Sequence, residues 1–162
     1  MSLGMKFAAV LPEPFRFQPT GGRVEGPAFS RVFQSLTTVV VAGCMGWVWR
    51  LWQRGAIDYG PGLAWVAAAL ALMACTWWAV MRSRTVVGAD ALQQRWLWNK
   101  RMDLADMAFC KVIRVPGLDW LVAPRLYART LTGKFSVFYG ATPELREEFK
   151  RLSQELAAFR RM

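Results

Sequence analysis

The sequence predicts a membrane-inserted α-helical hairpin followed by an α+β domain, and three observations lead to this fold class. Two apolar segments occupy residues 32–52 and 62–81, and each is long enough, as a helix of about 20 residues, to cross a bilayer core of about 30 Å. Residues 84–140 then alternate short β-branched and aromatic runs with turn formers. Residues 143–162 finish the chain with an amphipathic helical pattern.

The two apolar segments are expected to span a membrane rather than to form a protein core. The first carries a single charge, Arg50 near its end, and the second carries none, in a chain of 162 residues that is 54% hydrophobic. Helices that are apolar on every side need a large protein to cover them as core helices. The rest of this chain is too short to do so.

The connection at 53–61 contains Gly55, Gly60 and Pro61, so a tight loop joins the spans and leaves both termini on one side. Residues 1–31 form an N-terminal arm without the apolar region of a cleavable signal peptide. The basic residues near the outer ends of the spans are Arg16, Arg23, Arg31, Arg82, Arg84, Arg95, Lys100 and Arg101. The loop side has only Arg50 and Arg54, so the positive-inside rule places both termini in the cytoplasm, at a bacterial inner membrane.

Aromatic side chains cluster at the ends of both predicted spans, where an aromatic belt belongs. Arg50 can extend its charge to the headgroups from this depth. The predicted interface anchors are Trp47, Trp49, Arg50, Trp52, Trp65, Trp77 and Trp78. The first cluster would face away from the cytoplasm, which argues against a platform for nucleic acid.

Small residues recur at four-residue spacing in both spans, as Ala42 and Gly46 and as Ala67 and Ala71. Such faces allow helices to approach closely, either within the hairpin or against a partner. The spans carry no central Asp, Glu, Lys or His, which argues against a self-contained transporter. A pore formed by several copies remains an alternative, and its lining would come from Gln34, Ser35, Thr37, Thr38 and Thr76.

No catalytic, cofactor or metal site is expected. The chain has no histidine, and its three cysteines, Cys44, Cys75 and Cys110, lack the close spacing of a zinc or redox motif. Asp103 and Asp106 lie three residues apart and Asp119 follows, but nothing nearby predicts a cleft that would raise a carboxyl pKa. We interpret the cysteines as structural thiols and the aspartates as solvated loop residues.

Residues 82–162 carry 15 Lys or Arg and eight Asp or Glu, a net charge of +7. Their composition predicts strands of an antiparallel sheet at 84–92, 93–99, 108–116, 120–131 and 134–140. Turns are predicted at the Asn99-Lys100 pair and around Gly133.

A helix is predicted from Pro143, with Thr142 as its N-cap and Pro143 at its first position. Acidic residues near its start and basic residues near its end suit the helix dipole. One apolar stripe would lie against the sheet and contains Leu145, Phe149, Leu152, Leu156 and Phe159.

This layout resembles the bacterial PH-like membrane proteins. The resemblance lies in the strand "TVVGADALQQRW" after the last span, the element "MDLADMAFCKVIRV", and the terminal helix, although Met107 stands where that family usually has Ile or Val. It implies a PH-like split antiparallel β-barrel at 82–162, capped by the C-terminal helix. It also implies a non-enzymatic role and assembly with copies of itself or with other membrane proteins.

We therefore expect an accessory or scaffold subunit that docks in the lipid bilayer through its hairpin and binds a protein partner through its PH-like domain. The N-terminal arm would reach along a partner, lie on its own domain or be a flexible tail. The alternative function is recognition of anionic lipid headgroups, where orientation during insertion would need the same charges. Its candidate contacts are Arg82, Arg84, Arg95, Lys100 and Arg101. Nucleic acid is not an expected partner, because Trp96 and Trp98 would lie in a barrel core or face the membrane.

Overall fold

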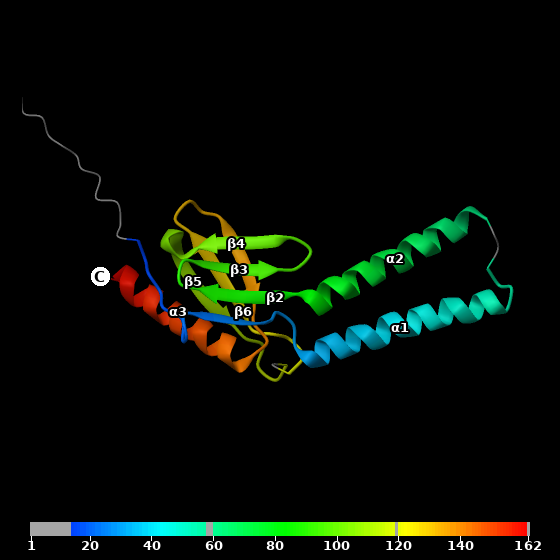
Figure 1. Cartoon of the computed structure of the whole chain (residues 1–162), viewed down its shortest axis with the longest axis horizontal. Helices are drawn as coiled ribbons and strands as arrows, with labels where there is room; N and C mark the ends of the chain where they lie inside the picture. Colours follow the sequence, from blue (N-terminus) through cyan, green and yellow to red (C-terminus); the bar gives the residue numbers. More distant parts are fainter. Residues whose placement is uncertain (1–13, 58–59, 119, 162) are drawn as a thin grey trace, which may run out of the picture.

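The computed structural model describes residues 14–57, 60–118 and 120–161. A helical hairpin projects from one side of a domain that contains two antiparallel sheets and a C-terminal helix (Figure 1). This layout confirms the predicted α+β arrangement with two long apolar helices.

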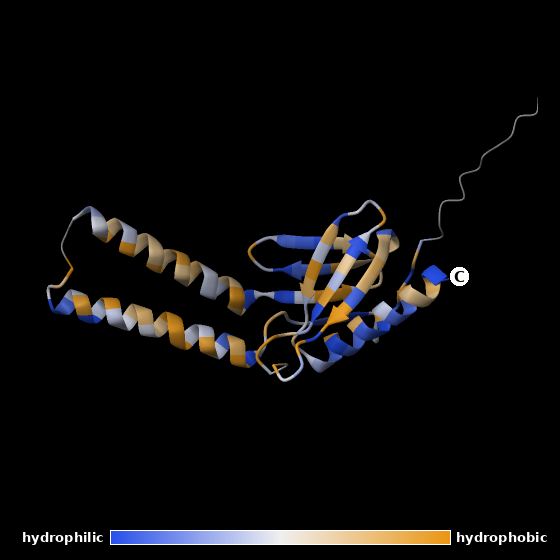
Figure 2. Ribbon diagram, turned by 180° about the vertical axis from the view of Figure 1, so that it is seen from behind, coloured by the Kyte–Doolittle hydropathy of each residue, from blue (hydrophilic) through white to orange (hydrophobic). Residues whose placement is uncertain are grey.

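The hairpin consists of α1 (Arg31–Gln53) and α2 (Pro61–Arg82), close to the predicted spans. The Ser30 hydroxyl caps α1 by accepting a hydrogen bond from the amide of Phe33 at 3.1 Å, and Pro61 begins α2. Both helices are long and apolar enough to cross a membrane, and apolar side chains cover most of their length (Figure 2). None of the most apolar part of α1 and only 6% of that of α2 is buried, so neither helix packs as a core helix within the described chain.

The two helices meet along a narrow seam. Trp77 donates a hydrogen bond from Nε1 to the Thr38 hydroxyl across this seam, at 2.9 Å. The partly buried positions recur at helical spacing on each side, at Thr37, Val41, Cys44, Val48 and Leu51 of α1 and at Leu63, Val66, Leu70, Met73 and Trp77 of α2.

The first sheet contains β1 (Arg23–Pro27), β2 (Arg84–Gly88), β3 (Ala91–Arg95) and β4 (Asn99–Asp103), paired in that order. β1 comes from the N-terminal arm and pairs antiparallel with β2, with Pro27 opposite Arg84. The whole hairpin is therefore an insertion between two neighbouring strands of one sheet.

Three sequence predictions about this sheet are wrong, and one of them is the strand at 93–99, because β3 ends at Arg95 and β4 begins at Asn99. The strand predicted at 84–92 is two strands, because the chain turns at Ala89 and Asp90, whose carbonyl accepts a hydrogen bond from Leu104. The predicted turn at Asn99-Lys100 lies inside β4, and the real turn is 96–98. Tryptophan favours strands because it packs well on a half-buried sheet face. In this turn only Trp96 packs at the base of the hairpin, against Phe29, and Trp98 is exposed.

A short 3-10 helix, η1 (Leu104–Asp106), leads to the second sheet, which contains β5 (Met107–Ile113), β6 (Arg125–Thr130) and β7 (Phe135–Tyr139). The predicted turn around Gly133 is confirmed. Gly133 has a φ of 86°, and its amide bonds the carbonyl of Thr130 at 3.0 Å. This left-handed conformation suits glycine.

The final helix, α3 (Pro143–Arg161), forms as predicted. The Thr142 hydroxyl accepts a hydrogen bond from the amide of Leu145 at 3.4 Å. The predicted apolar stripe lies inward, with Phe159 partly buried and the other four members buried.

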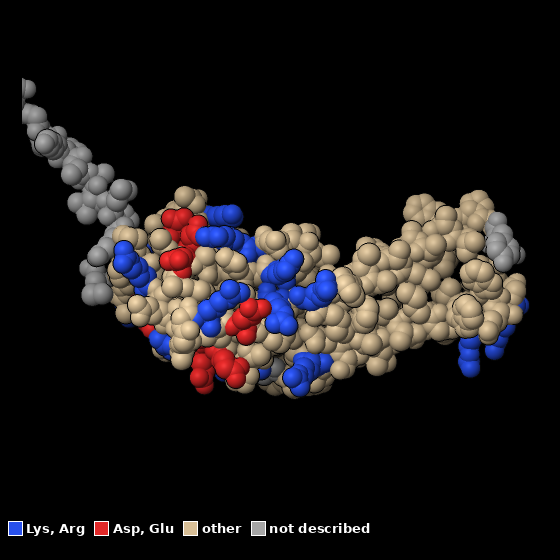
Figure 3. Space-filling view, in the orientation of Figure 1, with Lys and Arg blue, Asp and Glu red and all other residues tan. Residues whose placement is uncertain are grey.

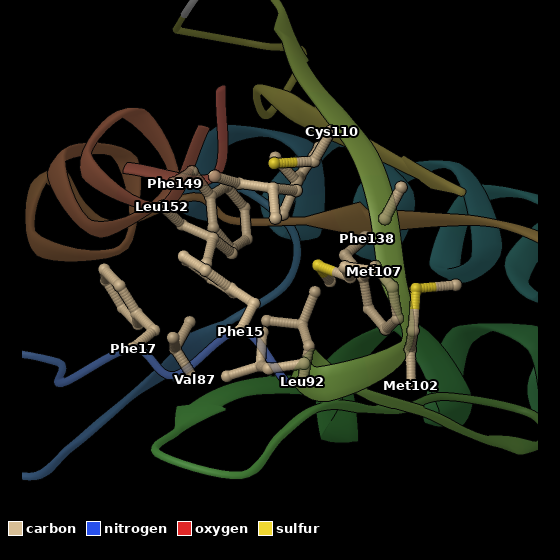
Figure 4. Close-up of a cluster of buried hydrophobic side chains, with 14 of the residues drawn as sticks. Phe15, Phe17, Val87, Leu92, Met102, Met107, Cys110, Phe138, Phe149 and Leu152 are labelled. Atoms are coloured by element: carbon tan, nitrogen blue, oxygen red, sulfur yellow. The ribbon is translucent and has the colours of Figure 1, made fainter. Parts of the chain in front are cut away.

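One hydrophobic core joins both sheets, α3 and the N-terminal arm. Phe15 and Phe17 of the arm belong to the same buried cluster as Leu92, Phe138 and Phe149 (Figure 4). Thr20 hydrogen-bonds the buried Glu148 of α3, which Arg151 pairs with at 3.0 Å. The described part of the arm therefore lies on its own domain, one of the three arrangements that the sequence left open.

We expect Phe17→Ala to lower the free energy of unfolding by about 3–5 kcal/mol, because Phe17 is 1% exposed in this core. Phe109 is 56% exposed and provides the matched control. Phe109→Ala should change stability by no more than about 0.5 kcal/mol. Urea denaturation in detergent, followed by near-UV circular dichroism, measures both. Equal effects would show that the arm is not part of the folded core.

Candidate membrane-interface site

The base of α2 and the first sheet enclose an open groove with a volume of ≈ 970 Å³. Its apolar wall comes from the last turns of α2 and from the β3–β4 turn, and its basic wall comes from the adjoining ends of α2, β2 and β3. The main lining residues are Cys75, Trp77, Trp78, Arg82, Arg84, Arg95, Trp96 and Leu97.

Strand register brings the arginines of the groove together. Arg84 and Arg95 are directly opposite each other in the β2–β3 pair, where like charges repel. Glu25 on β1 offsets part of this repulsion through an ion pair of 3.3 Å with Arg84. Within the described residues, Arg95 has no ion pair or hydrogen bond, and neither does Arg82 in the same groove. Both guanidinium groups are therefore available to an anionic ligand.

Arg82 extends along the surface of α2 rather than into open solvent. Its guanidinium lies 4.5 Å from the ring centroid of Trp78, a cation–π contact of a kind that orients arginine at an interface. The sequence located both residues at the inner end of the span but did not predict that they would form one surface.

The remaining candidate headgroup residues lie beside the groove. Arg101 shares the outward face of the sheet and pairs with Asp103 at 3.1 Å. Lys100 occupies the alternate position in β4, opposite the buried Gln94. A neighbouring hollow of ≈ 570 Å³ includes both residues together with Arg84 and Arg95. Basic side chains consequently gather where the domain meets the hairpin (Figure 3).

The predicted interface anchors divide into two groups. Five tryptophans present more than half of their surface to the outside of the helices, namely Trp47, Trp49, Trp52, Trp65 and Trp78. Trp77 instead turns into the seam and bonds Thr38. Arg50 lies with Arg54 around a second hollow near the loop end of α1.

The small residues do not form the helix seam. Ala42 and Gly46 of α1 and Ala67 and Ala71 of α2 are all exposed. A Cβ built on Gly46 would meet nothing within 4 Å. These four residues therefore lie outside the seam, which larger side chains such as Val41 and Val66 occupy. The alternative of contact with a partner stays open.

The threonines considered for a pore satisfy their hydroxyls within their own helices. Thr37, Thr38 and Thr76 each donate to the carbonyl four residues earlier, at 2.8 Å. This bonding reduces what they offer to a water-filled lining.

Within the described ranges, no group of three Cys, Asp or Glu side chains could hold a metal ion. Asp103 and Asp106 are exposed, and Asp119 lies outside the described residues. Cys44 and Cys75 are free thiols of the hairpin, and Cys110 is a buried free thiol of β5.

Comparisons with known proteins return no matching protein family, no matching curated protein and no matching solved structure. The resemblance to PH-like membrane proteins thus has support only from the order of the apolar helices, sheets and terminal helix.

Burial raises the pKa of the Cys110 thiol to about 11, against a smaller lowering by its hydrogen bond with Ser153. The thiol therefore stays protonated, and because the thiolate is the nucleophile, we expect Cys110 to react with iodoacetamide at pH 8 about 100-fold more slowly than free cysteine. A variant with Cys44→Ala and Cys75→Ala isolates this thiol for mass spectrometry. Reaction at the free-cysteine rate without denaturant would contradict the buried position.

Proposed function

We propose that this protein is a non-catalytic membrane accessory or scaffold subunit. Its hairpin docks against other membrane proteins or a second copy of the chain, and its inner domain binds a protein partner. The observation that carries this proposal is the outward exposure of Gly46 and Ala71, since small residues let a neighbouring helix approach closely in a bilayer.

The order of strands and helix in the inner domain supports the proposal of a PH-like split barrel. Four antiparallel strands form one sheet and three form the other, and α3 covers their shared core. We infer that the two sheets act as the halves of such a barrel. PH-type folds offer loops and sheet edges to ligands and peptides, and their function depends on the particular surface.

The outward face of the second sheet is the best candidate surface for the protein partner. In register across the three strands lie Phe109, Arg129 and Phe135, and the two phenylalanines are each 56% exposed. Arg125 stacks 5.5 Å from the ring centroid of Tyr139 on the same sheet. Aromatic residues and arginine are enriched among residues that contribute most to protein binding.

We also propose that both termini lie in the cytoplasm at a bacterial inner membrane. Arg31 and Arg82 are at the domain end of the two helices, and Arg50 and Arg54 are at the loop end. The larger number of basic residues near the domain end supports this orientation by the positive-inside rule.

We expect Gly46→Leu to reduce crosslinking of the protein to its membrane partner, or to its own second copy, by about tenfold because the added side chain separates the backbones. Crosslinking in native membranes, gentle detergent extraction and mass spectrometry identify the partner. Val40→Leu provides a control, because Val40 is 51% exposed on a different face of the same helix, and this change should leave the complex intact. Extraction of the unaltered protein as a monomer without companions would overturn the scaffold proposal.

The groove favours a second candidate function, binding of an anionic phospholipid. Arg95 lacks a partner within the described chain, while Cys75 and Trp78 extend the groove along α2. A phosphate beside the arginines would leave an acyl chain next to the apolar helix surface. Each basic residue near an anionic membrane surface contributes about 1 kcal/mol.

We expect the double variant Arg84→Gln and Arg95→Gln to retain about tenfold less phosphatidylglycerol than the unaltered protein. Native mass spectrometry from mixed phosphatidylglycerol and phosphatidylcholine nanodiscs measures this retention. Lys111→Gln with Arg129→Gln removes the same charge from the second sheet and should have little effect. Equal losses in both variants would indicate general electrostatic attraction without a lipid site in the groove.

A further inference from the structure

We propose that the domain rests directly on the inner lipid leaflet and inserts two apolar loops on either side of the hairpin base, one at 96–98 and one whose described residues are 115–118 and 120–121. This proposal depends on the membrane-spanning hairpin proposed above, and it adds a second, peripheral contact with the same bilayer. It does not depend on a protein partner.

The first loop is the turn between β3 and β4. Leu97 is 52% exposed and Trp98 is 62% exposed. Both side chains are large and apolar, so water is an unfavourable surrounding for them. Trp96 holds the base of this loop, because its ring lies 5.9 Å from that of Phe29 and 6.2 Å from that of Trp98. The groove beside α2 includes Trp96 and Leu97 together with Trp77 and Trp78, so the loop adjoins the inner end of that helix.

The second loop connects β5 and β6. It exposes Val115 by 40%, Leu118 by 41% and Trp120 by 58%. Its backbone is organised by its own turns, with the amide of Leu118 bonded to the carbonyl of Val115 at 3.1 Å and that of Leu121 bonded to the carbonyl of Leu118 at 3.0 Å. The loop therefore holds its apolar side chains outward without packing them on the domain.

Direct contacts place both loops at the domain end of the hairpin, where α1 begins and α2 ends. The Ser30 hydroxyl, which caps α1, donates to the carbonyl of Leu121 at 2.9 Å. Phe29 precedes that cap, stacks on Phe33 at 5.3 Å and contacts Trp96 of the other loop. Figures 1 and 2 show the second loop beside the first turn of α1, with apolar residues along it.

The chemistry of this surface fits a lipid interface better than solvent. Tryptophan and leucine beside arginine are the residue types that enter the headgroup region. Arg31, Arg82 and Arg95 stand at the same end of the domain. Asp119, the acidic residue in the sequence of the second loop, lies outside the described residues. A rigid hairpin that spans the bilayer would tether both loops at the membrane surface. Their contact with lipid would then be intramolecular, which raises their effective concentration at that surface.

The test uses the full chain in nanodiscs, in a background with Cys44→Ala and Cys75→Ala. Three variants of this background carry Trp98→Cys, Trp120→Cys or Leu131→Cys. The introduced thiol of each variant is labelled with an environment-sensitive fluorophore. The buried Cys110 stays in place. Leu131 is the matched control, because it is an apolar loop residue, 52% exposed, in the turn between β6 and β7 at the opposite end of the domain.

We expect blue-shifted emission at positions 98 and 120, with quenching by lipids brominated near the headgroup, and neither effect at 131. Unquenched, water-like emission at 98 or 120 would overturn the proposal and leave that loop as a surface for protein. Nanodiscs that hold one copy without companions make the result independent of the scaffold role. Quenching of labels on α1 in the same nanodiscs reports separately whether the hairpin spans the bilayer.

Discussion

The pairing of β1 with β2 is the constraint on which the rest of this structure depends. Pro27 lies opposite Arg84, and the amide of Ala28 bonds the carbonyl of Ser83 at 3.3 Å, so the two ends of the hairpin leave the sheet side by side. Neighbouring strands are about 4.8 Å apart, whereas packed helices need about 8–10 Å between their axes. The chain must diverge as it enters the helices. Aromatic side chains such as Phe29 and Trp77 occupy the widening base, and the basic groove opens at its edge.

The same pairing makes the arm, the hairpin and the domain one mechanical unit. β1 is preceded by Phe15 and Phe17, which are buried against α3 and both sheets, and it is followed after three residues by α1. Short connections on both sides of the hairpin leave little freedom for the domain to swing relative to the two helices. Surfaces at the hairpin base, including the groove and the two apolar loops, therefore have a fixed orientation relative to the helices, which is what a binding surface on a membrane needs.

The features that could be predicted from the sequence are those set by local pattern. The two apolar helices, the turn at Gly133 and the capped helix α3 follow from composition, glycine and helical periodicity, which act over a few residues. β1 was missed because its partner strand lies beyond the whole hairpin, and only pairing with Thr85 and its neighbours makes that segment a strand. The basic residues were found as a cluster, but strand register decides that Arg95 lies opposite Arg84 and that Lys100 lies opposite the buried Gln94. The outward position of Gly46 likewise depends on which side chains fill the seam.

The insertion of the hairpin between paired strands also sets the order in which this protein can fold during synthesis. β1 leaves the ribosome before either helix, and its partner β2 follows only after both helices have emerged. Chains emerge N-terminus first, and contacts between residues far apart in sequence form slowly. The first sheet therefore cannot be completed until both apolar helices have been synthesised, and until then Phe15 and Phe17 lack their core. A fragment that starts after α2 lacks β1 and both of these side chains, so the natural folding unit of the domain includes its membrane hairpin.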